Sequence, residues 1–271
     1  MMNVRLGICD WALPGGGLYG PRIAADAGLD ALALKIGEYA NNYPISEPEM
    51  QKYYLQEQDH CGIEYCALAL NDYDNIPMHA PENTPDYERI MEIARRAIQT
   101  VRALHIPMIQ VPAFAQSAIE TEEQMARSAK VLRLLCEEAG ALGVTVSHEG
   151  LLSPEEFKTL YEMVGQKNFG VYFDSQNYFL FKGWDEVEVL HGFYPYMVDQ
   201  LHVKDGAGAM SGALLGKGDS GFYQTMAALK DKGFEGVILL ENYYDQLPLR
   251  LAGESPYALL KEDIAILKAA L

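Results

Sequence analysis

The sequence has few basic residues, and this shortage narrows the functions that it can have. Lysine and arginine total 21 against 38 aspartate and glutamate, so the formal net charge at pH 7 is -17. Proteins that bind a nucleic-acid backbone usually need a basic face, because neutralising the phosphates supplies most of the binding affinity. The charge balance therefore argues against nucleic acids and anionic membranes as partners.

Long apolar runs and paired cysteines are also lacking. No stretch approaches the roughly 18 apolar residues of a membrane-spanning helix, and the N-terminal residues lack the apolar centre of a signal peptide. The four cysteines, Cys9, Cys61, Cys66 and Cys136, have no zinc-type CxxC spacing. Three of them lie in apolar runs or helix faces, where a thiol behaves as a small hydrophobe. These features predict free thiols and a cytoplasmic location.

The sequence is rich in a repeated unit: a short apolar run, a turn, and a longer segment with helical periodicity. With 271 residues, of which 49% are apolar, it suits a (β/α)₈ barrel. The predicted strands are Val4–Cys9, Ala31–Ile36, Glu64–Leu70, Met108–Val111, Val144–Glu149, Val171–Asp174, Gln200–Lys204 and Val237–Glu241. Strands that alternate with helices are typical of parallel sheets joined by crossovers. We therefore predict an α/β fold, a (β/α)₈ TIM barrel, with residues 1–271 in a single domain.

Helix starts and one long loop can be placed from local signals. Thr121 with Gln124, and Ser153 with Glu156, are typical of capping boxes, and Ser255 precedes a proline that opens the last helix. Residues 71–85 form the longest irregular stretch and follow the third strand. In a barrel this places them at the C-terminal face, where we expect a lid or a substrate loop.

Four successive strands end in side chains that can bind a metal. In the run from Val144 to Glu149, apolar and polar residues alternate, so Glu149 shares the face that points to the barrel axis. The same alternation turns Asp174 and His202 inward, and the strand before Glu241 is apolar on both faces until it ends in this carboxylate. The carboxylates and the imidazole are therefore expected to converge.

A divalent cation would explain this convergence. Carboxylates that meet in an apolar mouth repel one another, and burying them unpaired is costly. Oxygen ligands with one imidazole suit Mn²⁺, Mg²⁺ or Co²⁺, and Zn²⁺ is less natural without thiolates. Taken singly, Glu149 can be an ion-pair member, Asp174 a loop cap and His202 a satisfied core histidine. Taken together on successive strand ends, Glu149, Asp174, His202 and Glu241 predict a metal site.

These segments resemble a known family. The runs VSHEG, VYFDSQN and LHVKD, and the segment GKGDSGFYQTMAALKDKGFEGVILLENY, are similar to the xylose isomerase-like TIM barrels called sugar phosphate isomerases/epimerases. The match is most specific from about Val144 to Tyr243. The resemblance implies one divalent metal held by the four residues above. It also implies that Glu149 and Glu241 exchange protons with the carbon beside a carbonyl, which the metal polarises.

One position departs from a subgroup of this family. In the ketose 3-epimerases, the third residue after the metal-binding aspartate is a histidine that helps to anchor the sugar, whereas this sequence has Asn177. Asparagine can hydrogen-bond a hydroxyl but cannot carry charge or shuttle a proton near neutral pH. A specific 3-epimerase activity is therefore less favoured, and the metal site is unaffected.

Five residues are candidates for substrate binding, and three of them have a structural alternative. Asn177 is one, and Lys204 can hold a hydroxyl, carboxylate or phosphate, or else form an ion pair with a metal-binding carboxylate. Trp11 can stack on a sugar or simply close the barrel. His79 lies on the long loop, and Lys217 lies in a glycine-bearing loop that is equally typical of a plain turn.

The predicted function is a metal-dependent isomerase or epimerase of a small sugar, sugar phosphate or related keto-polyol. A lyase that dehydrates a keto-inositol would use the same proton abstraction, and a non-catalytic, metal-dependent sugar-binding protein is a third alternative. A nuclease of the same fold is opposed by the acidic charge. Dimers and tetramers are frequent among relatives, so the resemblance also allows a homo-oligomer.

Overall fold

The chain forms a single-domain (β/α)₈ TIM barrel in which eight strands close in chain order. The computed structural model describes residues 2–271, so Met1, the first residue of the predicted domain, lies outside them. The strands are β1 (Val4–Cys9), β2 (Ala31–Lys35), β3 (Glu64–Ala69), β4 (Met108–Ala113), β5 (Thr145–Gly150), β6 (Phe169–Asp174), β7 (Met197–Val203) and β8 (Gly236–Leu240). All eight predicted strands are confirmed.

Helices follow the strands as expected of this fold. The α-helices are α1 (Gly20–Asp26), α2 (Pro48–Cys61), α3 (Pro85–Leu104), α4 (Glu122–Gly140), α5 (Pro154–Val164), α6 (Asn177–Lys182), α7 (Glu186–Phe193), α8 (Phe222–Lys232) and α9 (Pro256–Ala270). Short 3-10 helices occupy Gly17–Tyr19, Tyr39–Asn41, Pro44–Ser46, Asn71–Asn75, Ala115–Ser117, Tyr194–Tyr196 and Leu249–Ala252. Within residues 2–271, no helix combines the length and apolar character needed to cross a membrane.

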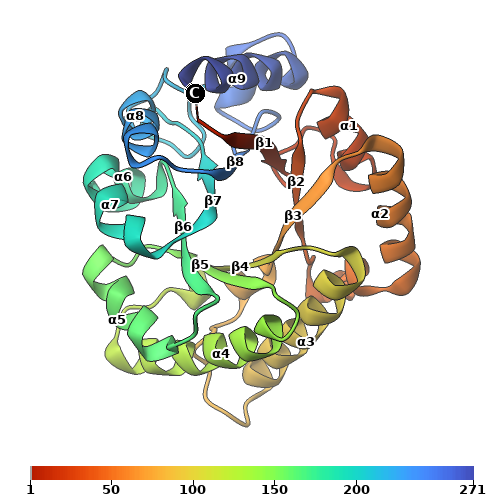
Figure 1. Ribbon diagram of the computed structural model, residues 1–271, viewed down its shortest axis with the longest axis vertical. Coiled ribbons are helices and arrows are strands. Elements are labelled where there is room, and N and C mark those ends of the chain that lie inside the picture. Colours follow the sequence, from red (N-terminus) through yellow and green to blue (C-terminus); the bar gives the residue numbers. More distant parts are fainter. Residues whose placement is uncertain (1) are drawn as a thin grey trace. The chain divides into compact units, whose positions relative to one another are not determined.

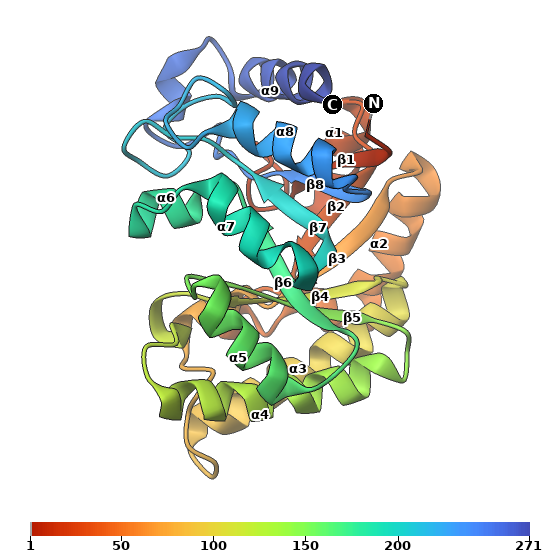
Figure 2. The ribbon, with the colours of Figure 1, turned by 60° about the vertical axis from the view of Figure 1, so that its left-hand side comes forward.

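The residues group into two compact units, which we describe separately. The described residues of unit 1 are 2–33, 61–64 and 173–271. In this unit β1 pairs in parallel with β2 and with β8, and β8 pairs with β7. Helices α7, α8 and α9 pack in succession (Figure 1). The two ends of the chain meet, because Met2 donates its backbone N–H to the carbonyl oxygen of Leu271 at 3.3 Å (Figure 2).

Unit 2 comprises Leu34–His60 and Tyr65–Tyr172. Here β3, β4, β5 and most of β6 form parallel pairs in that order. Helices α3, α4 and α5 pack next to one another along the outer side of β4 and β5 (Figure 1). The core of this unit therefore lies between the strands and these three helices.

The predicted helix starts are confirmed. Thr121 accepts from the backbone N–H of Gln124 at 3.2 Å, and the Gln124 side chain accepts from the backbone of Thr121 at 2.9 Å. Ser153 and Glu156 make the same reciprocal pair. Ser255 accepts from the backbone N–H of Ala258. These caps satisfy backbone donors that a helix start leaves without an intrahelical partner.

The loop after β3 is more ordered than the sequence predicted. Residues 71–75 form a 3-10 helix, and Asp72 is buried. Asp72 accepts from the Tyr43 hydroxyl at 2.6 Å and forms an ion pair with Arg89 of α3 at 2.6 Å. Burial would raise the pKa of Asp72, but hydrogen bonds from Tyr43, Asn75 and Arg89 outweigh it and lower the pKa. These contacts, which the local sequence does not show, correct the prediction that the whole segment is irregular; its role as a lid stays a prediction.

Candidate metal centre

Three of the predicted ligands lie together in unit 1. Asp174 is the last residue of β6, His202 is near the end of β7, and Glu241 directly follows β8. Asp174 and His202 are fully buried and Glu241 is 6% exposed. Each offers a ligand atom, and these atoms lie within 4.8 Å of one another. Two carboxylates and an imidazole at this separation are a donor set that fits a small divalent cation.

Glu149, the fourth predicted ligand, belongs to unit 2. It lies near the end of β5, is 4% exposed, and accepts a hydrogen bond from the side-chain amide of Gln110 on β4. Its neighbour His148 packs on the opposite side, against Phe157 of α5, with ring centroids 5.9 Å apart. This agrees with the predicted alternation along the strand. Gln110 was not among the predicted residues, although a lone glutamine in the apolar run MIQV is a signal that could have identified it.

Lys204 supplies positive charge to the two carboxylates in unit 1. Its Nζ donates to Glu241 Oε2 at 2.5 Å and lies 3.1 Å from Asp174 Oδ2, and the residue is 2% exposed. Burial would raise the pKa of Glu241, but the charges and hydrogen bonds of His202 and Lys204 hold that pKa well below its usual range. Of the two predicted roles, the ion pair is the one seen in the structure, and Glu241 is ionised at neutral pH.

Two residues from the end of β1 also contact this cluster. Trp11 donates from Nε1 to Glu241 Oε1 at 2.8 Å, and its ring meets the His202 ring edge-on at 6.0 Å. The sulfur of Cys9 lies 3.2 Å from His202 Nε2. Trp11 was predicted only to stack on a sugar or to close the barrel, and Cys9 was predicted to be a free thiol but not a residue of the site. The position of Cys9 as the last residue of β1 is the signal that could have identified it as a residue of the site.

Two buried acidic side chains accept hydrogen bonds from the backbone of the segment after β6. Asp174 Oδ1 accepts from the backbone N–H groups of Gln176 and Asn177, at 2.8 and 2.7 Å, which fixes Asn177 at the start of α6. Glu186 accepts from the backbone N–H of Phe179 at 2.8 Å. Burial, with a smaller contribution from the Asp174 charge, raises the pKa of Glu186 to about 9. Glu186 is therefore protonated at neutral pH.

The glycine-bearing loop after β7 folds around Asp205. The carboxylate accepts from the backbone N–H groups of Gly216 at 2.8 Å and Gly218 at 3.1 Å, and from the Ser220 hydroxyl at 2.5 Å. A Cβ added to Gly218 would overlap this carboxylate and the carbonyl oxygen of Gly206. Lys217, a predicted substrate contact, is 56% exposed and forms an ion pair with Glu262 of α9.

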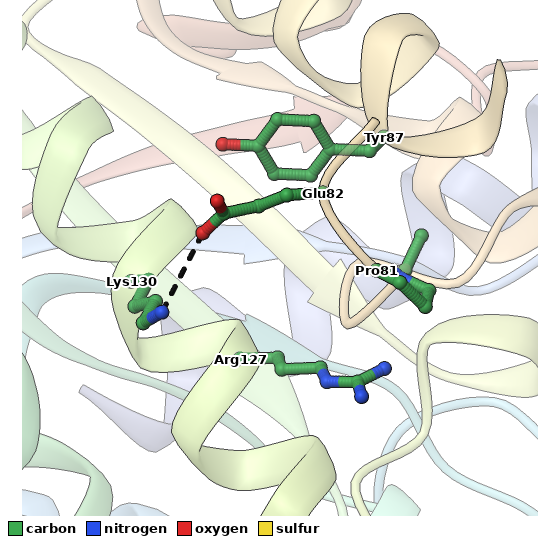
Figure 3. Close-up of a pocket in the computed structure, with 6 residues that line it drawn as sticks. Pro81, Glu82, Tyr87, Arg127 and Lys130 are labelled. Carbon is green, nitrogen blue, oxygen red and sulfur yellow. Dashed lines mark hydrogen bonds and ion pairs between the residues drawn. The ribbon is translucent and has the colours of Figure 1, made fainter. Parts of the chain in front are cut away.

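The predicted contact His79 lies in unit 2, beside a surface hollow. Its Nε2 is buried and has no hydrogen-bond partner among residues 2–271. The adjacent Ala80 helps to line a cavity of about 250 Å³, together with Pro81, Glu82, Tyr87, Arg127 and Lys130. Figure 3 shows Glu82 reaching toward Lys130, with nitrogen and oxygen 3.5 Å apart. Arg127 pairs with Glu123 of its own helix. The ion pairs that border this hollow are exposed, and such pairs contribute little to stability.

Comparisons with known proteins identify the family of this fold. A family model described as xylose isomerase-like TIM barrel matches residues 21–270. A 2-epi-5-epi-valiolone 7-phosphate 2-epimerase from an Actinoplanes species is 28% identical over 263 residues, which cover 95% of this chain and 94% of the relative.

Solved structures share the fold at low identity. The crystal structure of a D-allulose 3-epimerase from a Methylomonas species has a TM-score of 0.77 and 14% identity, with 100% of this chain and 99% of that one covered. The structure of the IOLI protein with a bound zinc atom has a TM-score of 0.73 and 17% identity, with 98% of each chain covered.

Proposed function

The chain belongs to the xylose isomerase-like TIM barrel family, and we propose that it is a metal-dependent epimerase or isomerase. The proposed substrate is a small sugar, a sugar phosphate or a related keto-polyol. The observation that carries the proposal is the buried cluster of Asp174, His202 and Glu241 at three successive strand ends. The similarity over nearly the full length to a 2-epi-5-epi-valiolone 7-phosphate 2-epimerase supports this class of reaction.

We propose that Glu149 completes the ligand set. It is the next-to-last residue of β5, and Asp174 is the last residue of β6. Its buried carboxylate lies on the strand face opposite the one that His148 turns to α5. Mn²⁺, Mg²⁺ and Co²⁺ suit the oxygen-rich set, and the zinc-bound relative keeps Zn²⁺ as an alternative. When bound, such an ion polarises a carbonyl and stabilises the negative charge of an enediolate.

The chain's own residues would move the proton. Glu241 is ionised, so it can take the proton from the carbon beside the carbonyl. Glu149 would be its counterpart in the proton transfer. Trp11 and Lys204 each hold one oxygen of Glu241, which fixes the orientation of the base. Asn177, which opens α6, would hold a substrate hydroxyl.

Exchange of a carbon-bound proton with solvent tests the proposal. Ketoses, their phosphates and keto-cyclitols are incubated in deuterium oxide, and deuterium at the carbon beside the carbonyl is followed by NMR. We expect exchange in the wild-type protein with Mn²⁺ or Co²⁺, and at least a 100-fold loss, about 2.7 kcal/mol, in Glu241→Gln. Glu262→Gln changes an exposed glutamate of α9 and serves as the matched control.

Four outcomes would count against the proposal or favour an alternative. Full exchange in Glu241→Gln would refute the mechanism. Exchange accompanied by loss of water from the substrate would indicate a lyase, and substrate binding without exchange would indicate a sugar-binding protein. If the protein neither retains a divalent ion nor gains thermal stability from Mn²⁺ or Co²⁺, the metal site itself is wrong.

A further inference from the structure

The two ring nitrogens of His202 face different partners. Nδ1 lies 3.3 Å from Glu241 Oε2, and Nε2 lies 3.2 Å from the sulfur of Cys9. Both Cys9 and His202 are fully buried. Trp11 packs edge-on against the same imidazole, at 77° between the ring planes. The ring is therefore enclosed between a carboxylate on one side and a thiol on the other.

A neutral imidazole can use only one nitrogen as a metal ligand, and its other nitrogen then carries the hydrogen. Nδ1 is the nitrogen beside Glu241, which is itself a proposed ligand, so Nδ1 is the atom directed to the metal. Nε2 then bears the N–H group, and Cys9 Sγ, 3.2 Å away, is an acceptor within its reach. Metal-binding histidines almost always donate this second N–H, and the partner fixes the tautomer and the ring orientation.

We propose that Cys9 is the positioning residue for His202: its sulfur accepts the Nε2–H hydrogen bond and holds the imidazole with Nδ1 toward the metal. The inference rests on the proposed metal site and adds a residue to it. Sulfur is a weak acceptor compared with the carboxylate or carbonyl usual in this role. We therefore place the effect at the lower end of the 10- to 100-fold range typical of such partners, at about 10-fold in metal affinity.

A different arrangement uses the same atoms. Cys9, His202 and Glu241 also offer ligand atoms within 4.8 Å of one another, so the sulfur could bind the ion directly if Nε2 faced it. This alternative needs a deprotonated thiol and leaves Nδ1 without the metal. The two arrangements predict different spectra, because only direct ligation produces a thiolate-to-metal charge-transfer band.

The experiment measures metal affinity rather than turnover. Dissociation constants for Mn²⁺ and Co²⁺ are obtained by competition with a chelating dye for the wild-type protein, Cys9→Ala, Cys9→Val and Cys9→Ser. The valine variant removes the acceptor without leaving a cavity, so it remains informative if alanine weakens the fold. Cys136→Ala removes another fully buried thiol, on α4 of unit 2, and is the matched control.

We expect Kd to rise about 10-fold in Cys9→Ala and Cys9→Val, to recover in Cys9→Ser, and to stay at the wild-type value in Cys136→Ala. We also expect the absorption spectrum of the Co²⁺-loaded protein to lack a thiolate charge-transfer band. A Kd within 2-fold of wild type in both Cys9→Ala and Cys9→Val would overturn the inference and leave the metal site standing. A charge-transfer band that disappears in Cys9→Ala would also overturn it, because Sγ would then be a ligand. If the wild-type protein binds neither ion, the proposed function fails and the inference with it.

Discussion

Lys204 provides the most direct test of how charge is balanced in the site. In the absence of metal, its ammonium is the cation that contacts both Asp174 and Glu241, at 3.1 and 2.5 Å. In Lys204→Met a side chain of similar length remains, but the two carboxylates lose this charge. Removing one partner of a buried ion pair costs about 3–5 kcal/mol, because it leaves uncompensated charge in the interior. With about 2–4 °C per kcal/mol for a chain of this size, Tm of the metal-free protein should fall by roughly 6–20 °C.

Bound metal should restore most of the stability that Lys204→Met loses. A divalent ion supplies positive charge to the same carboxylates, and ligand that binds only the folded state stabilises it in proportion to RT ln(1 + [L]/Kd). We therefore expect saturating Mn²⁺ to raise Tm more in Lys204→Met than in the wild-type protein, and to reduce the gap between them by at least half. Calorimetry or circular dichroism, in chelator and in Mn²⁺, measures both values.

Lys217→Met is the matched control, because Lys217 forms an exposed ion pair with Glu262. Such pairs contribute about 0–1 kcal/mol, so this variant should unfold close to the wild-type temperature in both conditions. If Lys204→Met loses the same stability with and without Mn²⁺, the ammonium and the metal do not act on the same carboxylates, and the reasoning is wrong.

Three further changes follow from contacts in unit 1. Trp11→Phe keeps an aromatic ring but removes the donor to Glu241, so we expect kcat to fall about 10-fold with little change in KM, measured by steady-state kinetics. Gly218→Ala places a Cβ against Asp205, and chemical denaturation should show a loss of about 1–3 kcal/mol. Burial raises the pKa of Asp263 on α9 to about 6 from its ordinary 3.8, so the folded protein binds this proton more tightly than the unfolded chain does. The free energy of unfolding that this difference contributes is fully present below pH 3.8 and is lost as pH rises through 6. The free energy of unfolding of the wild-type protein, relative to Asp263→Asn, should therefore fall by about 1–2 kcal/mol between pH 5 and pH 7.5.

Each of these has a clear contrary result. An unchanged kcat in Trp11→Phe would mean that the indole does not orient the base. Gly20→Ala adds a Cβ with ordinary packing room, so equal losses in it and in Gly218→Ala would contradict the steric argument. A stability difference that does not vary with pH would show that Asp263 does not retain its proton in the folded state.

The strands and the inward carboxylates could be predicted because they depend on local patterns. Alternation along Val144–Glu149 separates the face of Glu149 from the face of His148, and the ring of His148 does pack on α5. Capping boxes at Thr121 and Ser153 depend on residues three apart, so the sequence contains the whole signal. The same alternation predicted that Asp174 and His202 lie at the ends of neighbouring strands, as they do in the structure.

The partners that hold the site depend on contacts far apart in the chain. Trp11 and Glu241 are 230 positions apart, and Cys9 and His202 are 193 apart. The pairing of β1 with β8 and of β8 with β7 brings these residues together, and no local periodicity encodes which atoms then meet. The ordered loop after β3 was missed for the same reason, because its buried Asp72 is satisfied by Tyr43 and Arg89 from other elements.

The meeting of the two chain ends has a consequence for engineering. Since Met2 and Leu271 already share a hydrogen bond, a short linker could join the termini, and new ends could be opened elsewhere. In a circular permutant that starts at Phe173, all of unit 1 except Cys61–Glu64 becomes one continuous segment. That segment would carry Asp174, His202 and Glu241 together with Cys9 and Trp11. The unit 1 residues of the proposed metal centre could thus be encoded as one uninterrupted segment.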